Sequence, residues 1–301
     1  MLAEKLEKRP FEIKEIEGKG MGVIATRDIK AGELILKEKP FVVWADEEDA
    51  DDLEAILQKL TDRKREEFYA HHIANPYKGD RPSLGIFKTN GLPLHNDGAG
   101  LFEEASRFNH SCRPNCSHHW DEGQEVSWSI ANRDIGKGEE ICITYGKLWQ
   151  VKSKRREWWK TTFGFDCRCE ACSYPEERAT QSDIRRFAIH QMHKVVKSLK
   201  EEPLRLVLRI KVALKLFDKE GLLWGSSAFA HEAFKLCLLC GDRLNASRWL
   251  DKTLELETKE VGVWSTRYKE LEVWKGDPTL HPFWKGLRCL EGGTLILIGP
   301  E

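Results

Sequence analysis

The chain has 301 residues, which is enough for one large domain or two ordinary ones, and its charge is nearly balanced, with 48 Lys and Arg against 49 Asp and Glu. This balance argues against a dedicated nucleic-acid-binding domain, which needs a strongly basic surface. No apolar run approaches the ~20 residues that span a bilayer, and the N-terminus has no apolar signal core. We therefore expect a soluble, unsecreted protein without a membrane partner.

Nine cysteines occur in the chain, an odd number that fits poorly with a disulfide framework. Because no export signal is recognised, we expect the cysteines to be in a reducing compartment, where disulfides are rare. Reduced thiols or metal ligands are therefore the preferred interpretation.

Residues 11–44 have the pattern of short strands joined by turns. Gly18, Gly20 and Gly22 permit close approach of a backbone to a ligand, although an ordinary hairpin explains them more simply. The spacing Gly-x-Gly-x-x-Gly leading into a helix is absent, which disfavours a dinucleotide site.

The next segments alternate between turns, helices and strands. The polar stretch 27–33 recurs in similar form at 133–139, and both copies are predicted to be structural turns between strands. Residues 46–72 open with an acidic cluster and continue with leucines at helical spacing, so they are predicted to form a helical insert. Strand character returns in residues 125–145.

A compact polar run at residues 107–115 reads Arg-Phe-Asn-His-Ser-Cys-Arg-Pro-Asn. Asn109, His110 and Ser111 supply donors and acceptors, and Pro114 removes a backbone donor and disfavours a helix. By itself this run is either a polar turn or a binding segment.

Cys167, Cys169 and Cys172 place three thiols within six residues, which is too close for scattered core cysteines. In a reducing compartment, tetrahedral zinc is the natural use of such a group. Zinc requires a fourth ligand from elsewhere in the fold, and spacing does not choose among the candidates. These are Cys112, Cys116, His118 and His119.

Residues 152–160 are basic and rich in tryptophan. We predict a helix with a solvated charged face and either Trp158 or Trp159 packed inward; the alternative is contact with an acidic partner.

From about residue 182 to residue 277 the pattern is helical, and residues 234–254 resemble one tetratricopeptide helix pair. Such hairpins pack together or bind protein partners. Cys237 and Cys240 have no second pair nearby and are predicted to be buried apolar cysteines. The tail at residues 292–299 is either a final strand or a docked end.

Four segments together resemble the SET-domain protein lysine methyltransferases in order and in type, over about residues 10–175. The helical tail and the cysteine-rich element look most like the SMYD branch of that family. SMYD proteins carry a cysteine-rich MYND finger inside the SET domain, whereas residues 46–106 contain no cysteine, so the chain looks SMYD-like without this module. The four segments are Gly20–Gly22, Arg107–Asn115, Gly138–Gly146 and Cys167–Cys172.

The resemblance implies an α+β fold. It consists of a mainly-β SET fold of short strands with a pseudoknot-like crossing, a helical insert, a post-SET zinc element and an α-helical, tetratricopeptide-like lobe. The expected bounds are 10–147 for the SET domain with its insert at about 46–100, 148–178 for the post-SET element and 179–301 for the lobe.

The resemblance also implies an S-adenosylmethionine-dependent protein-lysine N-methyltransferase acting on a histone or another protein. Tyr145 would be the catalytic residue, Phe163 and Tyr145 would wall the lysine channel, and Cys112 would join the three clustered cysteines on one structural zinc ion. The residues implied to contact the cofactor are Lys19, Gly20, Met21, Asn90, Asn109, His110, Tyr145 and Phe165.

The expected chemistry is an in-line displacement, in which alignment of the amine, the methyl group and the sulfur supplies much of the acceleration. A positive sulfonium and a desolvated channel both lower the pKa of the lysine amine. The alternative is a catalytically silent SET-fold module that binds proteins and uses zinc only structurally. We further expect a monomer, located in the cytoplasm, the nucleus or both, with a protein partner on the helical lobe.

Overall fold

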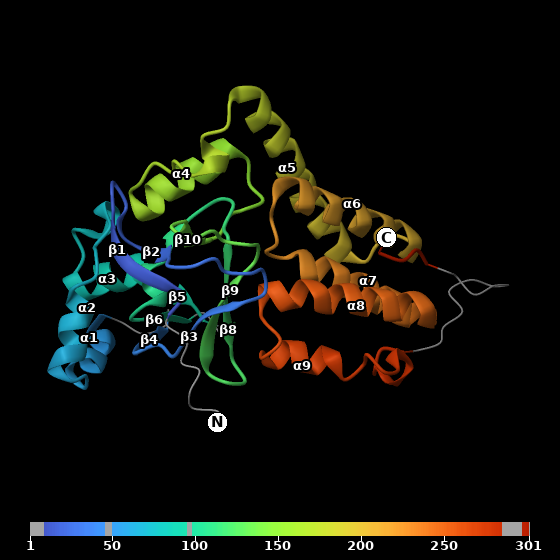
Figure 1. Cartoon of the computed structure of the whole chain (residues 1–301), viewed down its shortest axis with the longest axis horizontal. Helices are drawn as coiled ribbons and strands as arrows, with labels where there is room; N and C mark the ends of the chain where they lie inside the picture. The colour runs from blue at the N-terminus through green and yellow to red at the C-terminus, as the bar shows by residue number, and fades with distance from the viewer. Residues whose placement is uncertain (1–8, 46–49, 95–97, 285–296, 301) are drawn as a thin grey trace. The chain divides into compact units, whose positions relative to one another are not determined.

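A computed structural model shows that the chain divides into two compact units (Figure 1). The first consists of Met1–Tyr145 with Ser153–Cys172, and the second consists of Gly146–Lys152 with Ser173–Glu301. Short strands and helices occur in the first unit and helices dominate the second, which confirms the predicted α+β class. The predicted domain bounds stay predictions. The structure describes residues 9–45, 50–94, 98–284 and 297–300.

Within the described residues, the strands of the first unit form three small sheets, with the orders β1-β2-β10-β7, β3-β9-β8 and β4-β6-β5. Almost every neighbouring pair is antiparallel, but β7 and β10 pair in parallel. Parallel neighbours need a crossover connection, which β8 and β9 provide here. The strands are β1 Phe11–Ile16, β2 Gly20–Ala25, β3 Leu34–Glu38, β4 Val42–Ala45, β5 Leu92–Pro93, β6 Gly98–Leu101, β7 Asn109–His110, β8 Cys116–Asp121, β9 Val126–Ala131 and β10 Glu140–Ile143.

Three helices, α1 Ala50–Gln58, α2 Asp62–Tyr69 and α3 Pro82–Asn90, lie within the predicted insert, and Figure 1 shows them grouped beside the strands. Each begins with a recognisable signal. Acidic residues occupy the first turn of α1, the Thr61 hydroxyl accepts from the backbone of α2, and proline opens α3. Their apolar faces meet in a small core around Phe68. Residues 46–49 of the predicted insert lie outside the described residues.

The two similar polar stretches are turns, as predicted, and they pair with each other. Ile29 and Ile135 form an isolated bridge with two backbone hydrogen bonds of 2.9 Å. Asp134 accepts from the backbone of residue 31, and Asp28 accepts in the same way from residue 137, each at 2.9 Å. Each copy thus satisfies the backbone of the other, which explains why the sequence repeats.

The second unit is built from helical hairpins. Leu199, Gly221 and Gly241 each adopt a left-handed conformation at a helix end, and the short turns that follow make successive helices pack against each other. No helix in the described part of the chain is long and apolar enough to cross a bilayer. The bounds are α5 Glu176–Ser198, α6 Pro203–Glu220, α7 Ser226–Cys240, α8 Arg243–Glu260 and α9 Thr266–Glu272.

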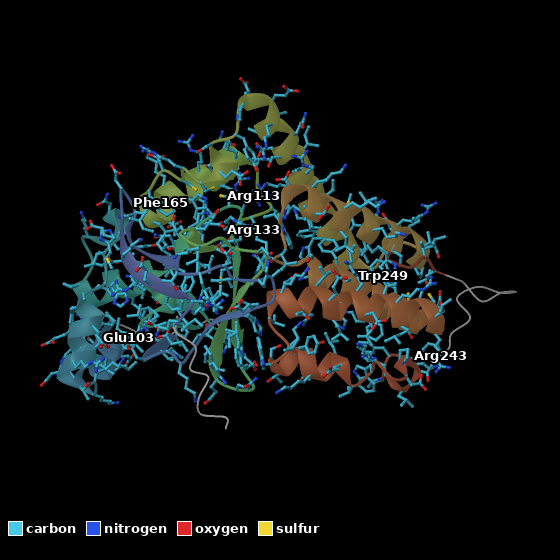
Figure 2. All side chains as sticks on the ribbon, in the orientation of Figure 1. Glu103, Arg113, Arg133, Phe165, Arg243 and Trp249 are labelled. Atoms are coloured by element: carbon cyan, nitrogen blue, oxygen red, sulfur yellow. The ribbon has the colours of Figure 1, made fainter. Side chains whose placement is uncertain are left out.

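The core of this unit includes Trp249, which is labelled in Figure 2, together with the buried Cys237 and Cys240. The burial of both cysteines confirms their predicted structural role. Of the predicted tail, only residues 297–299 are described. The backbone of Leu297 donates to Asp242, and the Trp249 indole donates to the carbonyl of residue 298, so this part of the tail is docked and is not a strand.

A buried ion pair ties the stretch 146–152 to the helices of the second unit. Arg186 is fully buried and donates to Glu220 at 3.0 Å and to the carbonyl of Leu148 at 2.6 Å. Ser182 also donates to Glu220, at 2.6 Å. Removal of one member of such a pair leaves an uncompensated charge in the core.

We therefore predict that Glu220→Ala lowers the free energy of unfolding of the helical unit by about 3–5 kcal/mol, because Arg186 loses its buried counter-charge. Glu201→Ala is the matched control, since it breaks a half-exposed pair with Arg209 and should cost less than about 1 kcal/mol. Urea denaturation of the full chain checks both values. Equal losses in the two variants would contradict the role given to the buried pair.

Candidate functional site

The parallel pairing of β7 with β10 brings the polar run 107–115 beside the strand that leads to Tyr145. Asn109 lies opposite Cys142, and His110 lies opposite Ile143. Immediately after β7, the backbone N–H of residue 111 donates to the carbonyl of Ile143 at 2.9 Å. The polar run is therefore part of a sheet, and its side chains lie next to β10.

Asn115 fixes this arrangement from the other end of the run. Its amide oxygen accepts from the backbone N–H of Cys142 at 2.8 Å, and its amide nitrogen donates to the carbonyl of Glu140 at 2.9 Å. The side chain of Asn115 is 2% exposed, so both bonds are shielded from water.

At the edge of β2, the side chain of Asn109 faces the glycine-rich strand. Its amide donates to the carbonyl of Met21 at 3.3 Å and to the carboxylate of Glu140 at 3.0 Å, and Glu140 also binds the ammonium of Lys19. A Cβ atom on Gly22 would lie 2.6 Å from the Asn109 amide nitrogen. The close approach of Asn109 to β2 therefore requires glycine at position 22. Lys19, Met21 and Asn109, which were all predicted to contact the cofactor, lie together in the structure.

Tyr145 follows β10 and binds two parts of the polar run. Its backbone N–H donates to Nδ1 of His110 at 3.2 Å, and its hydroxyl donates to the carbonyl of Phe108 at 2.9 Å. Burial raises the pKa of the Tyr145 hydroxyl well above its usual value, so the phenol stays protonated at physiological pH.

The hydrogen bond from Tyr145 also fixes the tautomer of His110. When Nδ1 accepts, a neutral imidazole carries its proton on Nε2. Nε2 lies 3.3 Å from the sulfur of Cys112, so His110 donates to this cysteine. The ring of His110 therefore connects the backbone of Tyr145 with Cys112.

Aromatic rings from α4, Lys152–Phe163, and from the segment after it surround Tyr145 and His110. Trp159 is fully buried, and its ring centroid lies 4.0 Å from that of His110. The ring centroids of Phe163 and Tyr145 lie 5.2 Å apart. The ring of Phe165 is nearly parallel to that of Trp159, with 6.3 Å between the two centroids. The inward residue of the Trp158–Trp159 pair is therefore Trp159, and Phe163 and Phe165 join the same group as Tyr145.

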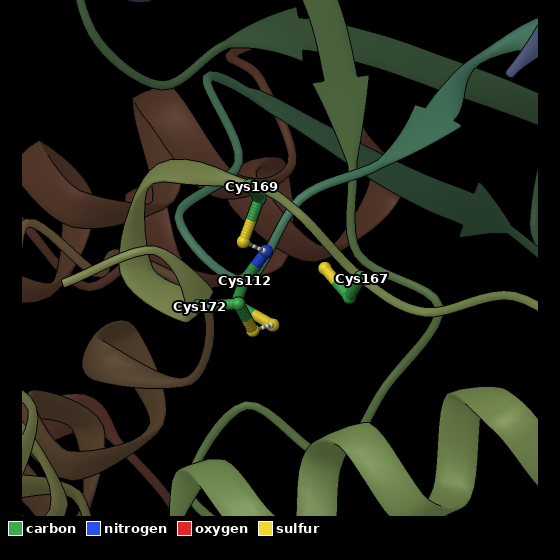
Figure 3. Close-up of side chains that lie close together, drawn as sticks. All are labelled: Cys112, Cys167, Cys169 and Cys172. Carbon is green, nitrogen blue, oxygen red and sulfur yellow. Dashed lines mark hydrogen bonds between the residues drawn. The ribbon is translucent and has the colours of Figure 1, made fainter. Parts of the chain in front are cut away.

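Four cysteines meet beside this aromatic group (Figure 3). The sulfurs of Cys112, Cys167, Cys169 and Cys172 all lie within 4.8 Å of one another. The sulfurs of Cys112 and Cys172 are 3.6 Å apart, and the backbone N–H of Cys112 donates to the sulfur of Cys169 at 3.4 Å. Zinc–sulfur bonds of about 2.3 Å in a tetrahedron separate the sulfurs by about 3.8 Å, so these residues fit a zinc ion.

The other candidates for a fourth ligand lie on β8, and the metal-ligand group found in the described residues contains none of them. Burial raises the pKa of Cys116 well above its usual value, as expected of an inert core thiol. His118 bonds to the hydroxyl of Ser127 at 3.1 Å, and burial lowers its pKa to about 4.

An ion pair braces the two segments that carry the cysteines. Arg113, labelled in Figure 2, follows Cys112, and its guanidinium contacts both carboxylate oxygens of Glu170, at 2.7 and 2.8 Å. Glu170 follows Cys169 in the 3-10 helix Glu170–Cys172.

Asn90 is placed differently from the other predicted residues. Its amide donates to the carbonyl of Ile86, one turn earlier in α3, and to the carbonyl of His72. These bonds tie Asn90 to α3 and to the loop before it, and no described hydrogen bond links it to Asn109 or His110.

Several residues that shape this site were not predicted from the sequence. Glu140 lies in the motif that was recognised, so its proximity to Asn109 and Lys19 could have been suspected. Trp159 was singled out only as a packing residue. Arg155 was assigned to a solvated charged face, but it is fully buried, and that part of the prediction is wrong. Helical periodicity alone contains no signal for such a charge.

Comparison with known proteins matches the SET domain to residues 20–146. The histone-lysine N-methyltransferase set5 of Schizosaccharomyces pombe is 30% identical over 283 residues, which cover 93% of this chain and 88% of that protein. The histone-lysine N-methyltransferase Smyd1 of Mus musculus is 27% identical over 174 residues, which cover 52% of this chain and 33% of that protein.

A third relative, the potential protein lysine methyltransferase SET6 of Saccharomyces cerevisiae, is 42% identical over 76 residues, which cover 25% of this chain and 20% of that protein. Similarity to set5 extends over nearly the whole chain, through the helical unit as well as the strands. The chain therefore belongs to the SET-domain family.

Proposed function

We propose that this protein is an S-adenosylmethionine-dependent protein-lysine N-methyltransferase. The observation that carries the proposal is the parallel pairing of β7 with β10, which places Asn109 and His110 beside both β2 and Tyr145. The names of relatives that act on histone lysines support the same activity. We extend the proposal to a protein substrate, since the target is a lysine side chain.

The residues around β2 suit the cofactor. Because Gly22 has no side chain, the Asn109 amide and the main chain of Met21 lie side by side and offer donors and acceptors to the amino-acid end of the cofactor. The partly exposed ring of Phe165 offers an apolar face to an adenine. When bound, S-adenosylmethionine supplies a methyl group on a positively charged sulfur.

The residues around Tyr145 suit a lysine amine. The rings of Tyr145 and Phe163 offer apolar walls, which disfavour the charged ammonium form and lower the pKa of the amine. The Tyr145 hydroxyl is fixed by its bond to the Phe108 carbonyl and can orient the amine and accept weak CH···O contacts. Because the phenol stays protonated, Tyr145 acts here by orientation and not as a base.

We also propose one structural zinc ion per chain, held by Cys112, Cys167, Cys169 and Cys172. Three of these cysteines directly follow Phe163 and Phe165, and Cys112 follows His110 by two residues. Zinc would therefore hold the aromatic residues against the polar run, although neither phenylalanine is a ligand.

Calorimetric titration with S-adenosylmethionine tests the proposed activity. We expect saturable binding of one cofactor to the zinc-loaded chain. Removal of zinc should weaken this binding by about tenfold or more, since Phe165 loses its anchor. Absence of binding to the folded, zinc-loaded chain would favour a silent interaction module and overturn the proposal. Unchanged cofactor affinity in a folded, zinc-free chain would refute only the predicted dependence of cofactor binding on zinc.

For catalysis, we predict that Tyr145→Phe lowers the rate of methyl transfer to protein by about 100-fold or more, while cofactor affinity stays close to wild type. The variant loses one hydroxyl and its bond to the Phe108 carbonyl. Transfer of labelled methyl groups to a protein mixture measures the rate. Tyr69→Phe, at an exposed tyrosine of α2, is the control and should keep full activity. Equal turnover by Tyr145→Phe would remove the tyrosine from the mechanism.

For the metal, we predict that Cys112→Ser and Cys167→Ser each lose the bound zinc, because three thiolates and a serine bind the ion much more weakly than four thiolates. Cys116→Ser removes a buried thiol of the same segment and should keep one zinc per chain. Elemental analysis of the dialysed variants checks the stoichiometry. Full zinc content in Cys112→Ser would mean that another residue completes the site.

A further inference from the structure

Residues 297–299 are held on the helical unit mainly through their main chain. The backbone N–H of Leu297 donates to the carboxylate of Asp242 at 2.6 Å, and its carbonyl accepts from the side-chain amide of Asn245. The carbonyl of Ile298 accepts from the indole N–H of Trp249 at 2.8 Å. Three side chains at the start of α8 therefore bind three main-chain groups, which most other residue types could also offer.

The side chains of this segment give the site its selectivity. Leu297 is 2% exposed and belongs to the apolar core of the helical unit, whereas Ile298 is 37% exposed. A Cβ atom on Gly299 would lie 3.2 Å from Oδ1 of Asn245 and 3.4 Å from Cδ of Arg248. The site therefore takes a buried leucine, then an exposed residue, then a small residue.

One polar atom of the site has no hydrogen-bond partner among the described residues. The amide nitrogen of Asn245 donates both to the carboxylate of Asp242 and to the carbonyl of Leu297, and these two acceptors fix the orientation of the amide. Its Oδ1 is buried and unpaired. Buried polar groups are almost always paired, so a ligand with a donor at this point would bind more tightly than the chain's own segment.

Serine is the residue whose side chain suits this acceptor. Its hydroxyl is attached directly to Cβ, so it can reach Oδ1 of Asn245, which lies 3.2 Å from the Cβ position at Gly299. Alanine offers no donor there, and a longer polar side chain would have to fit between Asn245 and Arg248.

We propose that Asp242, Asn245 and Trp249 form a peptide-binding site for a partner protein, and that residues 297–299 occupy it here as a tethered ligand. The preferred partner segment carries leucine and, two residues later, serine. A tethered segment has a high effective concentration at its site, so a partner must bind more tightly to displace it. The hydrogen bond from serine to Asn245 supplies such a difference. Neither zinc nor a cofactor takes part.

Fluorescence anisotropy of labelled peptides tests the proposal. The probes are a peptide with the sequence of residues 296–301 and the same peptide with Gly299→Ser. The protein is the full chain with Leu297→Ala, which weakens the tethered segment so that a probe can enter. We expect saturable binding of both peptides, with about fivefold higher affinity for the serine peptide, the usual gain from one neutral hydrogen bond.

Variants of the protein and of the probe isolate the contact with serine. Asn245→Ala, added to the Leu297→Ala chain, should abolish the difference between the two peptides, because the acceptor is lost. Leu244→Ala, at a leucine of the same helical turn that is 63% exposed, should leave both affinities unchanged. If Asn245→Ala does not fold, as judged by circular dichroism, a Gly299→Ala peptide takes its place and should bind no better than the glycine peptide.

The chain without Leu297→Ala gives a second measurement. Here each peptide must displace the tethered segment, so both should bind more weakly. Gly299→Ser in the full chain should weaken binding of the serine peptide about fivefold further, since the tethered segment then carries the same hydroxyl. Ile298→Ser places a hydroxyl at the exposed position and should have no such effect.

Absence of peptide binding to a folded Leu297→Ala chain would mean that residues 297–299 are a fixed part of the helical unit, and would overturn the proposal. Equal affinities for the glycine and serine peptides would overturn the partner segment that we assign. Sedimentation of the wild-type chain checks a further occupant: a dimer that the serine peptide dissociates would show that a second copy, and not another protein, fills the site.

Discussion

The site depends on the parallel pairing of two very short strands, Asn109–His110 and the end of Glu140–Ile143. Two residue pairs are too few to be stable alone, so other contacts must hold the register. Asn115 does so with hydrogen bonds to the backbone at residues 140 and 142, and its burial strengthens both bonds. A shift of one residue would turn Asn109 away from β2 and His110 away from Tyr145. One strand pairing therefore sets the positions of Asn109, His110 and Tyr145 together.

His110 extends this constraint from the sheet to the cysteines. The backbone of Tyr145 fixes its tautomer, and the opposite nitrogen then donates to Cys112. Trp159 covers the ring and excludes water, which makes both hydrogen bonds stronger and leaves little freedom to the imidazole. Two hydrogen bonds through His110 thus connect the sulfur of Cys112 with the backbone of Tyr145, the proposed catalytic residue. The four-cysteine group and the aromatic group share this residue, so the zinc ion proposed above would influence the aromatic group through His110.

Many residues of this site could be predicted from the sequence, but the contacts that bring them together could not. Three closely spaced cysteines predict a metal because their spacing is local, and the helices and turns were also predicted from local patterns. The fourth ligand was left open, because the choice between Cys112 and Cys116 depends on a long-range strand pairing without periodicity. The resemblance to SET-domain proteins favoured Cys112, and the structure brings it to the other three. Arg155 was misassigned because amphipathic patterning treats every cation as solvated, whereas this side chain is fully buried.

The segment that follows Tyr145 in the sequence is held by different contacts. Gly146 has φ 112° and Lys147 has φ 57°, so the backbone turns sharply directly after the tyrosine. Leu148 is then buried in the core of the helical unit, where Arg186 binds its carbonyl. Lysine rarely adopts a left-handed conformation, and such a conformation persists only where contacts on both sides enforce it. Before the tyrosine, β7, β10 and His110 hold the backbone, and after it the buried Arg186–Glu220 pair holds Leu148 within the helical unit.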